Sequence, residues 1–120
     1  MEGTAAGPVR DDEVLYRRVT PDQIKDGKIT SGVFRTRHDD GCSTESASYV
    51  SQEDCLGRGR PGGGLVSITG ADVTASGAQA TRDPTDPGHV LITGPGKKFP
   101  KELAIRAKLL VVPSAPGGGD

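Results

Sequence analysis

Glycine and proline interrupt this chain so often that no long helix or strand fits between them. The 120 residues include 18 glycines and 9 prolines, and five of the glycines fall within residues 57–64. Glycine weakens regular elements and proline removes a backbone donor, so these residues mark turns, loops and chain ends. We therefore expect short elements joined by many turns around one small core.

The supply of apolar side chains suits a single domain. Leu, Ile, Val and Phe together make 24 residues, a fifth of the chain, while the formal net charge is only −1. Disorder of the low-aliphatic kind also needs a high net charge, so a folded domain is favoured. We expect that domain over residues 13–113. Flexible tails are expected over residues 1–12 and 114–120, which have little to bury.

The chain shows no sign of a membrane or secretory destination. No apolar run approaches the roughly 20 residues of a membrane-spanning helix. The first twelve residues lack the basic and apolar regions of a secretory signal. Two cysteines, Cys42 and Cys55, are too few for a disulfide framework. The sequence therefore predicts a cytoplasmic protein that does not contact a membrane.

Short β-branched and aromatic runs alternate with helix-start signals along the chain. The strands we expect cover residues 14–19, 29–36, 65–69, 79–82 and 89–93, with a weak strand closed by residues 49–50. The helices we expect cover residues 21–27, 52–56 and 72–76, followed by a carboxy-terminal helix that begins near Pro100. Because residues 89–93 form the most continuous apolar run, we expect that strand to be buried on both faces.

The carboxy-terminal helix has the clearest periodicity. Leu103, Ala107 and Leu110 recur at helical spacing and predict an inward-facing stripe. Interleaved short helices and strands are typical of the α+β class. We expect one small mixed or antiparallel β-sheet, with short helices and the carboxy-terminal helix packed on one face.

The chain has few cysteine and histidine side chains that could bind a metal ion. His38, Cys42, Cys55 and His89 are the only four, and their spacing contains no Cys-x₂₋₄-Cys knuckle. Carboxylates flank both cysteines, in residues 39–40 and 53–54, and raise rather than lower a thiol pKa. We therefore expect no metal, no cofactor and no cysteine nucleophile.

A histidine pattern supports one enzymatic alternative. His89 follows two Asp-Pro pairs at residues 83–84 and 86–87, and a carboxylate partner would fix its tautomer for acid–base work. With His38 as a second proton carrier and Arg35 as phosphate clamp, the chain would be a small metal-independent hydrolase or nuclease. The alternative interpretation is that His89 is a structural residue at the start of a strand.

Basic residues support a second alternative, anion or nucleic-acid binding. Lys97, Lys98 and Lys101 surround the expected start of the carboxy-terminal helix, where backbone N–H groups favour anions. Arg58 and Arg60 lie in the glycine-rich loop and weakly resemble an RGG segment. The chain has only four aromatic residues and is nearly neutral, which disfavours a nucleic-acid partner.

Three segments resemble small bacterial proteins of unknown function. The segments are residues 15–19 (LYRRV), residues 29–35 (ITSGVFR) and residues 82–89 (RDPTDPGH). In those proteins an Arg-Arg strand, a Ser-x-x-Phe-Arg segment and an Asp-Pro…Pro-x-His turn occur in the same order. The resemblance covers about residues 14–110 and implies a bacterial cytoplasmic protein.

Charge is distributed unevenly along the chain. Residues 1–56 carry 7 basic and 11 acidic side chains, whereas residues 57–113 carry 8 basic and 4 acidic side chains. Such polarity orients a partner or a second copy of the chain, unless the two halves intermix in the fold. The sequence favours a non-catalytic bacterial protein-interaction module: an adaptor, antitoxin-like or immunity-like component whose protein partner is encoded with it.

Overall fold

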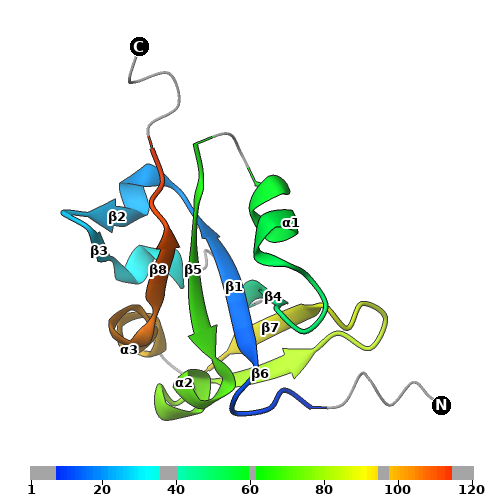
Figure 1. Ribbon diagram of the computed structural model, residues 1–120. Helices are drawn as coiled ribbons and strands as arrows, with labels where there is room; N and C mark the ends of the chain where they lie inside the picture. The colour runs from blue at the N-terminus through cyan, green and yellow to red at the C-terminus, as the bar shows by residue number, and fades with distance from the viewer. Residues whose placement is uncertain (1–7, 36–40, 60–61, 95–97, 115–120) are drawn as a thin grey trace.

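A six-stranded antiparallel sheet forms the centre of the protein, with strand order β6-β7-β4-β1-β5-β8 (Figure 1). The computed structural model describes residues 8–35, 41–59, 62–94 and 98–114. The strands of this sheet are β1 (Val14–Val19), β4 (Cys42–Ser46), β5 (Gly64–Thr69), β6 (Gln79–Arg82), β7 (His89–Thr93) and β8 (Lys108–Val111). A separate hairpin pairs β2 (Ile24–Lys25) with β3 (Lys28–Ile29).

The helices are short and lie between the strands. They are α1 (Gln52–Gly57), α2 (Gly70–Ala75) and α3 (Phe99–Arg106), with 3₁₀ turns η2 (Pro21–Gln23) and η3 (Ser31–Val33). No helix in the described ranges is long and apolar enough to cross a membrane. The expected α+β class is confirmed, as are the small antiparallel sheet and the carboxy-terminal helix on one of its faces.

Strand β1 occupies the middle of the sheet. All six of its residues pair with β5, from Val14 opposite Thr69 to Val19 opposite Gly64. On its other side β1 pairs with β4, where Tyr16 lies opposite Glu45. The amino-terminal strand therefore joins the two halves of the sheet.

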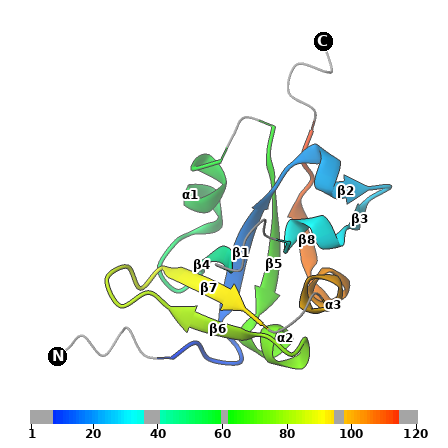
Figure 2. The same cartoon turned by 180° about the vertical axis from the view of Figure 1, so that it is seen from behind.

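The main core lies on one face of the sheet. Alternate residues of the central strands supply it, such as Leu15 in β1, Ile68 in β5 and Ile92 in β7. Segments that cross this face complete it, and Figure 2 shows α2, α3 and η3 on this side. The buried members are Leu15, Val19, Val33, Phe34, Cys42, Val66, Ile68, Val73, Val90, Ile92 and Leu103. In β4 and β7 burial alternates along the strand, so every second residue of these strands enters the core, whereas β5 is buried on both faces.

Helix α1 covers part of the opposite face. Ser51 caps it, because its hydroxyl accepts a hydrogen bond of 3.0 Å from the backbone N–H of Asp54. Cys55 of α1 packs with Val50 and Leu65 in a second, smaller core. The rest of this face carries exposed polar residues, including Ser43 and Thr81.

Residues 20–29 differ from the helix and strand expected there. Thr20 and Gln23 form the predicted capping box, yet the helix stops as the single 3₁₀ turn η2. The chain then enters the β2–β3 hairpin, whose turn residues Asp26 and Gly27 both have positive φ, 54° and 76°. Two positive φ values suit a tight hairpin turn, and Asp-Gly supplies them at little cost.

Two strand expectations near the middle of the sheet were wrong. Residues 49–50 form a turn, whereas the strand in this region is β4, whose Ser and Thr residues gave no apolar signal. Strand β7 is not buried on both faces, because only Val90 and Ile92 are buried while the residues around them are partly exposed. An antiparallel strand with one covered face alternates in this way.

The carboxy-terminal helix is shorter than its periodicity predicted. It ends at Arg106, and Ala107 already has extended backbone at φ −73° and ψ 154°. Leu103 is buried as expected, but Leu110 belongs to β8 and is 38% exposed. Residues 108–111 instead form β8 and pair with the otherwise open edge of β5, so tertiary pairing outweighs the helical spacing.

Candidate functional site

His89, the residue at the centre of the enzymatic alternative, begins β7 beside Asp83. Its Nδ1 lies 3.8 Å from Oδ2 of Asp83, which is too long for a hydrogen bond. The other oxygen of Asp83 accepts bonds of 2.8 Å from both the N–H and the hydroxyl of Thr85. These bonds lower the pKa of Asp83, with His89 making the smallest contribution. The carboxylate therefore shapes the hairpin turn more than it orients the imidazole.

The proposed partners of His89 are not brought to it in the described ranges. Arg35 follows Val33 and Phe34, which pack on the main-core face of the sheet. His89 precedes the core residue Val90 and so projects from the opposite face. No hydrogen bond or ion pair joins Arg35 to His89 among the residues that the structure describes. His38 lies outside those residues.

A carboxylate at the centre of that opposite face collects two arginines. Glu45 lies between Tyr16 and His89 in the register of the sheet. Its two oxygens accept from Nη1 of Arg18 and Nη1 of Arg58, one from β1 and one from the end of α1. Burial by itself would raise the pKa of Glu45, but hydrogen bonds from Cys55 and the two arginines outweigh it and lower that pKa.

The Cys55 thiol belongs to this cluster and is unreactive there. Its Sγ donates to Glu45 Oε1 at 3.0 Å. Burial, together with the hydrogen bond to Glu45 and its negative charge, raises the pKa of Cys55 to about 12. The sequence predicted this direction from residues 53–54, but the carboxylate responsible is Glu45. A thiol held in this way is not a nucleophile at neutral pH.

The other thiol is also buried and free. Cys42 packs in the main core opposite Ile92, and burial raises its pKa. The two cysteines therefore lie on opposite faces of the sheet and cannot form a disulfide or share a metal. No group of three or more His, Cys, Asp or Glu side chains in the described ranges is placed to hold a metal ion.

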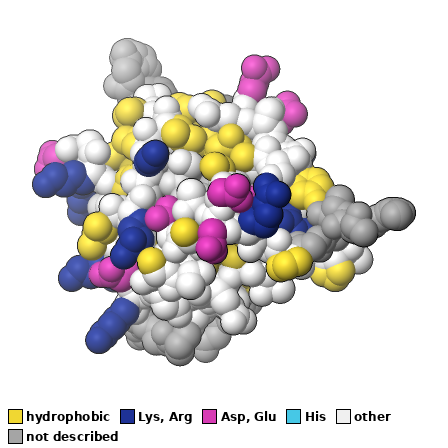
Figure 3. Space-filling model, turned by 60° about the horizontal axis from the view of Figure 1, so that its bottom comes forward, with side chains coloured by type: hydrophobic (Ala, Val, Ile, Leu, Met, Phe, Trp, Pro, Cys, Tyr) yellow, Lys and Arg dark blue, Asp and Glu magenta, His cyan; other side chains and the backbone are white. Residues whose placement is uncertain are grey.

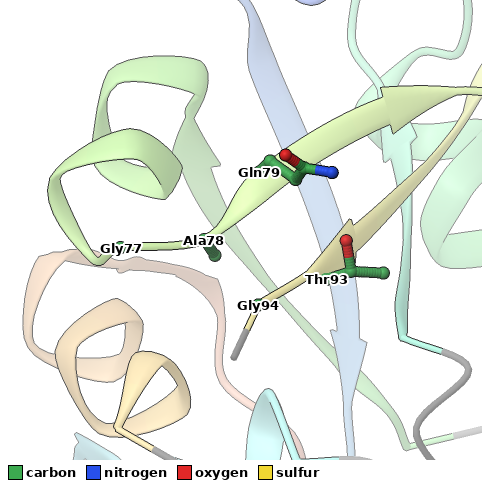
Figure 4. Close-up of a pocket in the computed structure, with 5 residues that line it drawn as sticks. All are labelled: Gly77, Ala78, Gln79, Thr93 and Gly94. Carbon is green, nitrogen blue, oxygen red and sulfur yellow. The ribbon is translucent and has the colours of Figure 1, made fainter. Parts of the chain in front are cut away.

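The described residues line two hollows of interest. One, of about 360 Å³, is lined by Arg18, Arg58, Leu56 and the glycines of the loop after α1. The other has a similar volume and lies where β6 begins and β7 ends, at residues 77–79 and 93–94 (Figure 4). Gln79 and Thr93 are the polar side chains there, and no titratable group lines it. Of these two hollows, the first brings charged side chains, Arg18 and Arg58, to a concave surface.

A second charge cluster is structural. Glu13 and Arg82 are 3% and 6% exposed, and Arg82 Nη2 lies 2.6 and 2.8 Å from the two carboxylate oxygens. Ser46 also donates to Glu13, and the guanidinium sits over the Tyr49 ring at 5.2 Å. Arg82 further donates to the carbonyl of Pro87 at 2.8 Å. This fully paired group ties β6 to the start of β1 and is not open to a ligand.

The predicted anion-binding residues are divided among different places. Lys98 and Lys101 lie at the start of α3 and are exposed, whereas Arg58 is bound to Glu45 beside α1. Lys97 and Arg60 lie outside the described residues. In Figure 3 many of the visible Lys and Arg side chains gather along one side of the molecule.

Exposed aliphatic residues accompany the basic ones at the carboxy-terminal end of the domain. Ile105 of α3 is 70% exposed, and Val112, just after β8, is 69% exposed. Together with Leu110 they are three of the four large hydrophobic residues exposed in the described ranges. We call α3, β8 and Val112 the α3–β8 edge; β8 is the last strand of the sheet, beside α3 in Figures 1 and 2.

Sequence reasoning did not identify Glu45 or Arg18 as members of a cluster. The available signal was an arginine at position 18, on the strand face opposite Leu15 and Val19, within a short β-branched run. Pairing it with Glu45 required knowing that residues 42–46 form a strand. The chain matches no protein-family model, and comparisons with curated proteins and with solved structures gave no match.

Proposed function

We propose that this chain is a non-catalytic bacterial protein-interaction module, an adaptor, antitoxin-like or immunity-like component that binds a protein partner encoded with it in the cytoplasm. The α3–β8 edge is the surface that carries this proposal. Its exposed aliphatic residues are Ile105 on α3, Leu110 on β8, the last strand of the sheet, and Val112 just after β8. Exposed aliphatic residues grouped on neighbouring elements are typical of a docking surface.

The charge around this edge indicates the chemistry of the partner. Residues 98–112 carry four basic side chains and one acidic side chain, Glu102. Lys98, Lys101, Arg106 and Lys108 make no ion pair among the described residues. We infer a partner surface with an apolar centre and a rim of Asp and Glu, since complementary charge steers association and fixes orientation.

The polar clusters support a binding role over catalysis. Both thiols have raised pKa values, and Asp83 is engaged by Thr85 more closely than by His89. The aliphatic centre favours a protein over a nucleic acid at the α3–β8 edge, because the one aromatic residue of this edge, Phe99, is partly buried and packs against the main core.

The test uses the protein products of the genes that flank its own gene. Each product is produced together with this chain, and complexes are measured by calorimetry. We expect one product to bind, and Leu110→Asp to weaken binding by about tenfold or more, as expected when charge enters the centre of an interface. Thr81→Asp is the matched control, because it adds the same charge to β6 at the other end of the sheet.

Two results would contradict the proposal. The first is that no flanking product binds, or that one binds Leu110→Asp as tightly as wild type. The second is that wild type binds duplex DNA or RNA at 150 mM salt and loses this binding in Lys101→Gln, which would assign the edge to nucleic acid.

A further inference from the structure

The arginine-lined hollow has features of a ligand site that the α3–β8 edge does not use. It lies between the end of β1, the end of α1 and the glycine loop before β5, and its volume is about 360 Å³. That volume is near the lower end of small-molecule sites, which run from about 300 to 1,000 Å³. A ligand that fits must be small.

Glu45 holds both arginines in place without using up their donors. It engages Nη1 of Arg18 and Nη1 of Arg58, while Arg18 Nη1 also reaches the carbonyl of Cys55 at 3.2 Å. The Nε and Nη2 groups of both arginines have no hydrogen-bond partner among the described residues. The side chains are 40% and 56% exposed, and both line the hollow. Two guanidinium groups already fixed by a carboxylate lose little freedom on binding.

The charge balance selects the class of anion. Arg18, Arg58 and Glu45 carry a net charge of +1, and with Asp54, which interacts with Arg58, the site is close to neutral. Such a site accommodates a singly charged carboxylate better than a phosphate, which brings up to twice the negative charge. Guanidinium donors bind carboxylates in bidentate geometry.

The remaining walls accommodate a short apolar body. Leu56 lines the hollow and is only partly buried. Glycines 59, 63 and 64 add backbone without side chains. A Cβ at Gly59 would lie 2.8 Å from Cδ of Arg18, so glycine at this position lets Arg18 extend along the wall.

We propose that this hollow binds the carboxylate of a small organic acid, whose oxygens accept from Arg18 and Arg58 and whose alkyl part contacts Leu56. This site is separate from the α3–β8 edge and does not depend on the proposed partner. The same carboxylate chemistry also exists at the end of a polypeptide, so the test includes both sources.

The test is a titration of ¹⁵N-labelled protein, followed by the backbone amide signals of Gly59, Gly63 and Gly64. The probes are hexanoate, hexanol as its neutral counterpart, inorganic phosphate, and N-acetyl-leucine as a model of a polypeptide carboxyl end. We expect saturable shifts with hexanoate and affinity at least tenfold weaker for hexanol and phosphate. Arg58→Gln is expected to weaken hexanoate binding about tenfold, whereas Arg106→Gln, an exposed arginine on α3, leaves it unchanged.

The titrations distinguish a site for a small organic acid, a site for a polypeptide carboxyl end, and the absence of a carboxylate site. Tighter binding of N-acetyl-leucine than of hexanoate supports the carboxylate site and assigns it to a polypeptide end. The proposal is overturned by unsaturated shifts at 20 mM hexanoate, by equal binding to hexanol or phosphate, or by equal affinity in Arg58→Gln. The amide spectrum reports folding of each variant, and Leu110→Asp should bind hexanoate like wild type whatever its effect on a protein partner.

Discussion

At Glu13, burial and hydrogen bonding act in opposite directions on one carboxyl group. Burial alone raises the pKa of Glu13, but bonds from Arg82, Ser46 and the backbone of Arg10 outweigh it and lower the pKa. The ion pair with Arg82 is almost fully enclosed, so each charge depends on the other. Such a pair adds little net stability over apolar residues, yet removing one partner is costly.

Replacing Glu13 by Gln should therefore strongly destabilise the fold. The substitution leaves the Arg82 guanidinium enclosed without its counter-charge, and we expect a loss of about 3–5 kcal/mol in the free energy of unfolding. Urea denaturation measures this loss. Asp12→Asn is the control, because Asp12 pairs with Arg10 on the open surface and its side chain is 81% exposed. Equal stability of Glu13→Gln and wild type would show that the pair is not formed.

The lowered pKa of Glu13 also predicts how the free energy of unfolding changes in acid. Because the pKa of Glu13 is lowered in the folded protein, its stabilising contribution is complete above the ordinary Glu value of about 4.3. It is lost as the pH falls through the lower folded value. The free energy of unfolding of wild type should fall between about pH 5 and 2 more steeply than that of Glu13→Gln. Parallel curves for the two proteins would contradict this assignment.

At the level of single elements, the buried residues of α3 are Pro100 and Leu103. Leu103 is fully buried in the main core, whereas Ile105, two residues later, is 70% exposed. Leu103→Ala should cost about 2–5 kcal/mol from lost burial and the cavity that remains. Ile105→Ala should change stability by no more than about 0.5 kcal/mol. Thermal and urea unfolding of the two variants test this contrast, which would disappear if α3 faced the other way.

Strand β8 depends on a glycine in its neighbour. A Cβ on Gly64 would meet the carbonyl oxygen of Val111 and lie 2.6 Å from Cδ of Pro113. Gly64→Ala should therefore push β8 away from β5 and speed hydrogen exchange at residues 108–111. Gly57→Ala is the control, because nothing lies within 4 Å of a Cβ there. Unchanged exchange in Gly64→Ala would show that β8 adapts without separating.

Elements with a strong local signal were predictable from the sequence. Residues 14–19 and 79–82 were placed as strands with the bounds that the structure has, and Ser51 correctly marked the start of α1. The errors lie where tertiary pairing decides. Residues 42–46 form a strand because they fit between β1 and β7, and residues 108–111 do so because β5 offers an open edge.

The candidate sites were harder to predict, for a related reason. The Glu45 cluster gathers residues from β1, β4 and α1, so it exists only after the sheet is assembled. The same holds for the Glu13–Arg82 pair, whose members are 69 positions apart. By contrast, the sequence correctly predicted that His89 lies near Asp83, because both residues belong to the β6–β7 hairpin and are close in the chain.

Across the whole molecule, the charge polarity of the sequence does not become two separate lobes. Strands β4 and β1, from the acidic half, occupy the middle of the sheet, and strands from the basic half lie on both sides of them. The two halves intermix, as one of the two initial interpretations required. Local charge, such as the basic excess at the α3–β8 edge, is therefore a better guide to partners than the difference between halves.

Strand β1 is central in the sheet and is made early, so it can pair with its neighbours only after later strands have been made. Strand β1 is synthesised before its main partner β5, which ends at Thr69, so about half of residues 13–113 must be made before this ladder can close. Until then Leu15 and Val19 remain in water. Non-local pairing of this kind slows folding, and apolar side chains that stay exposed in the meantime favour aggregation.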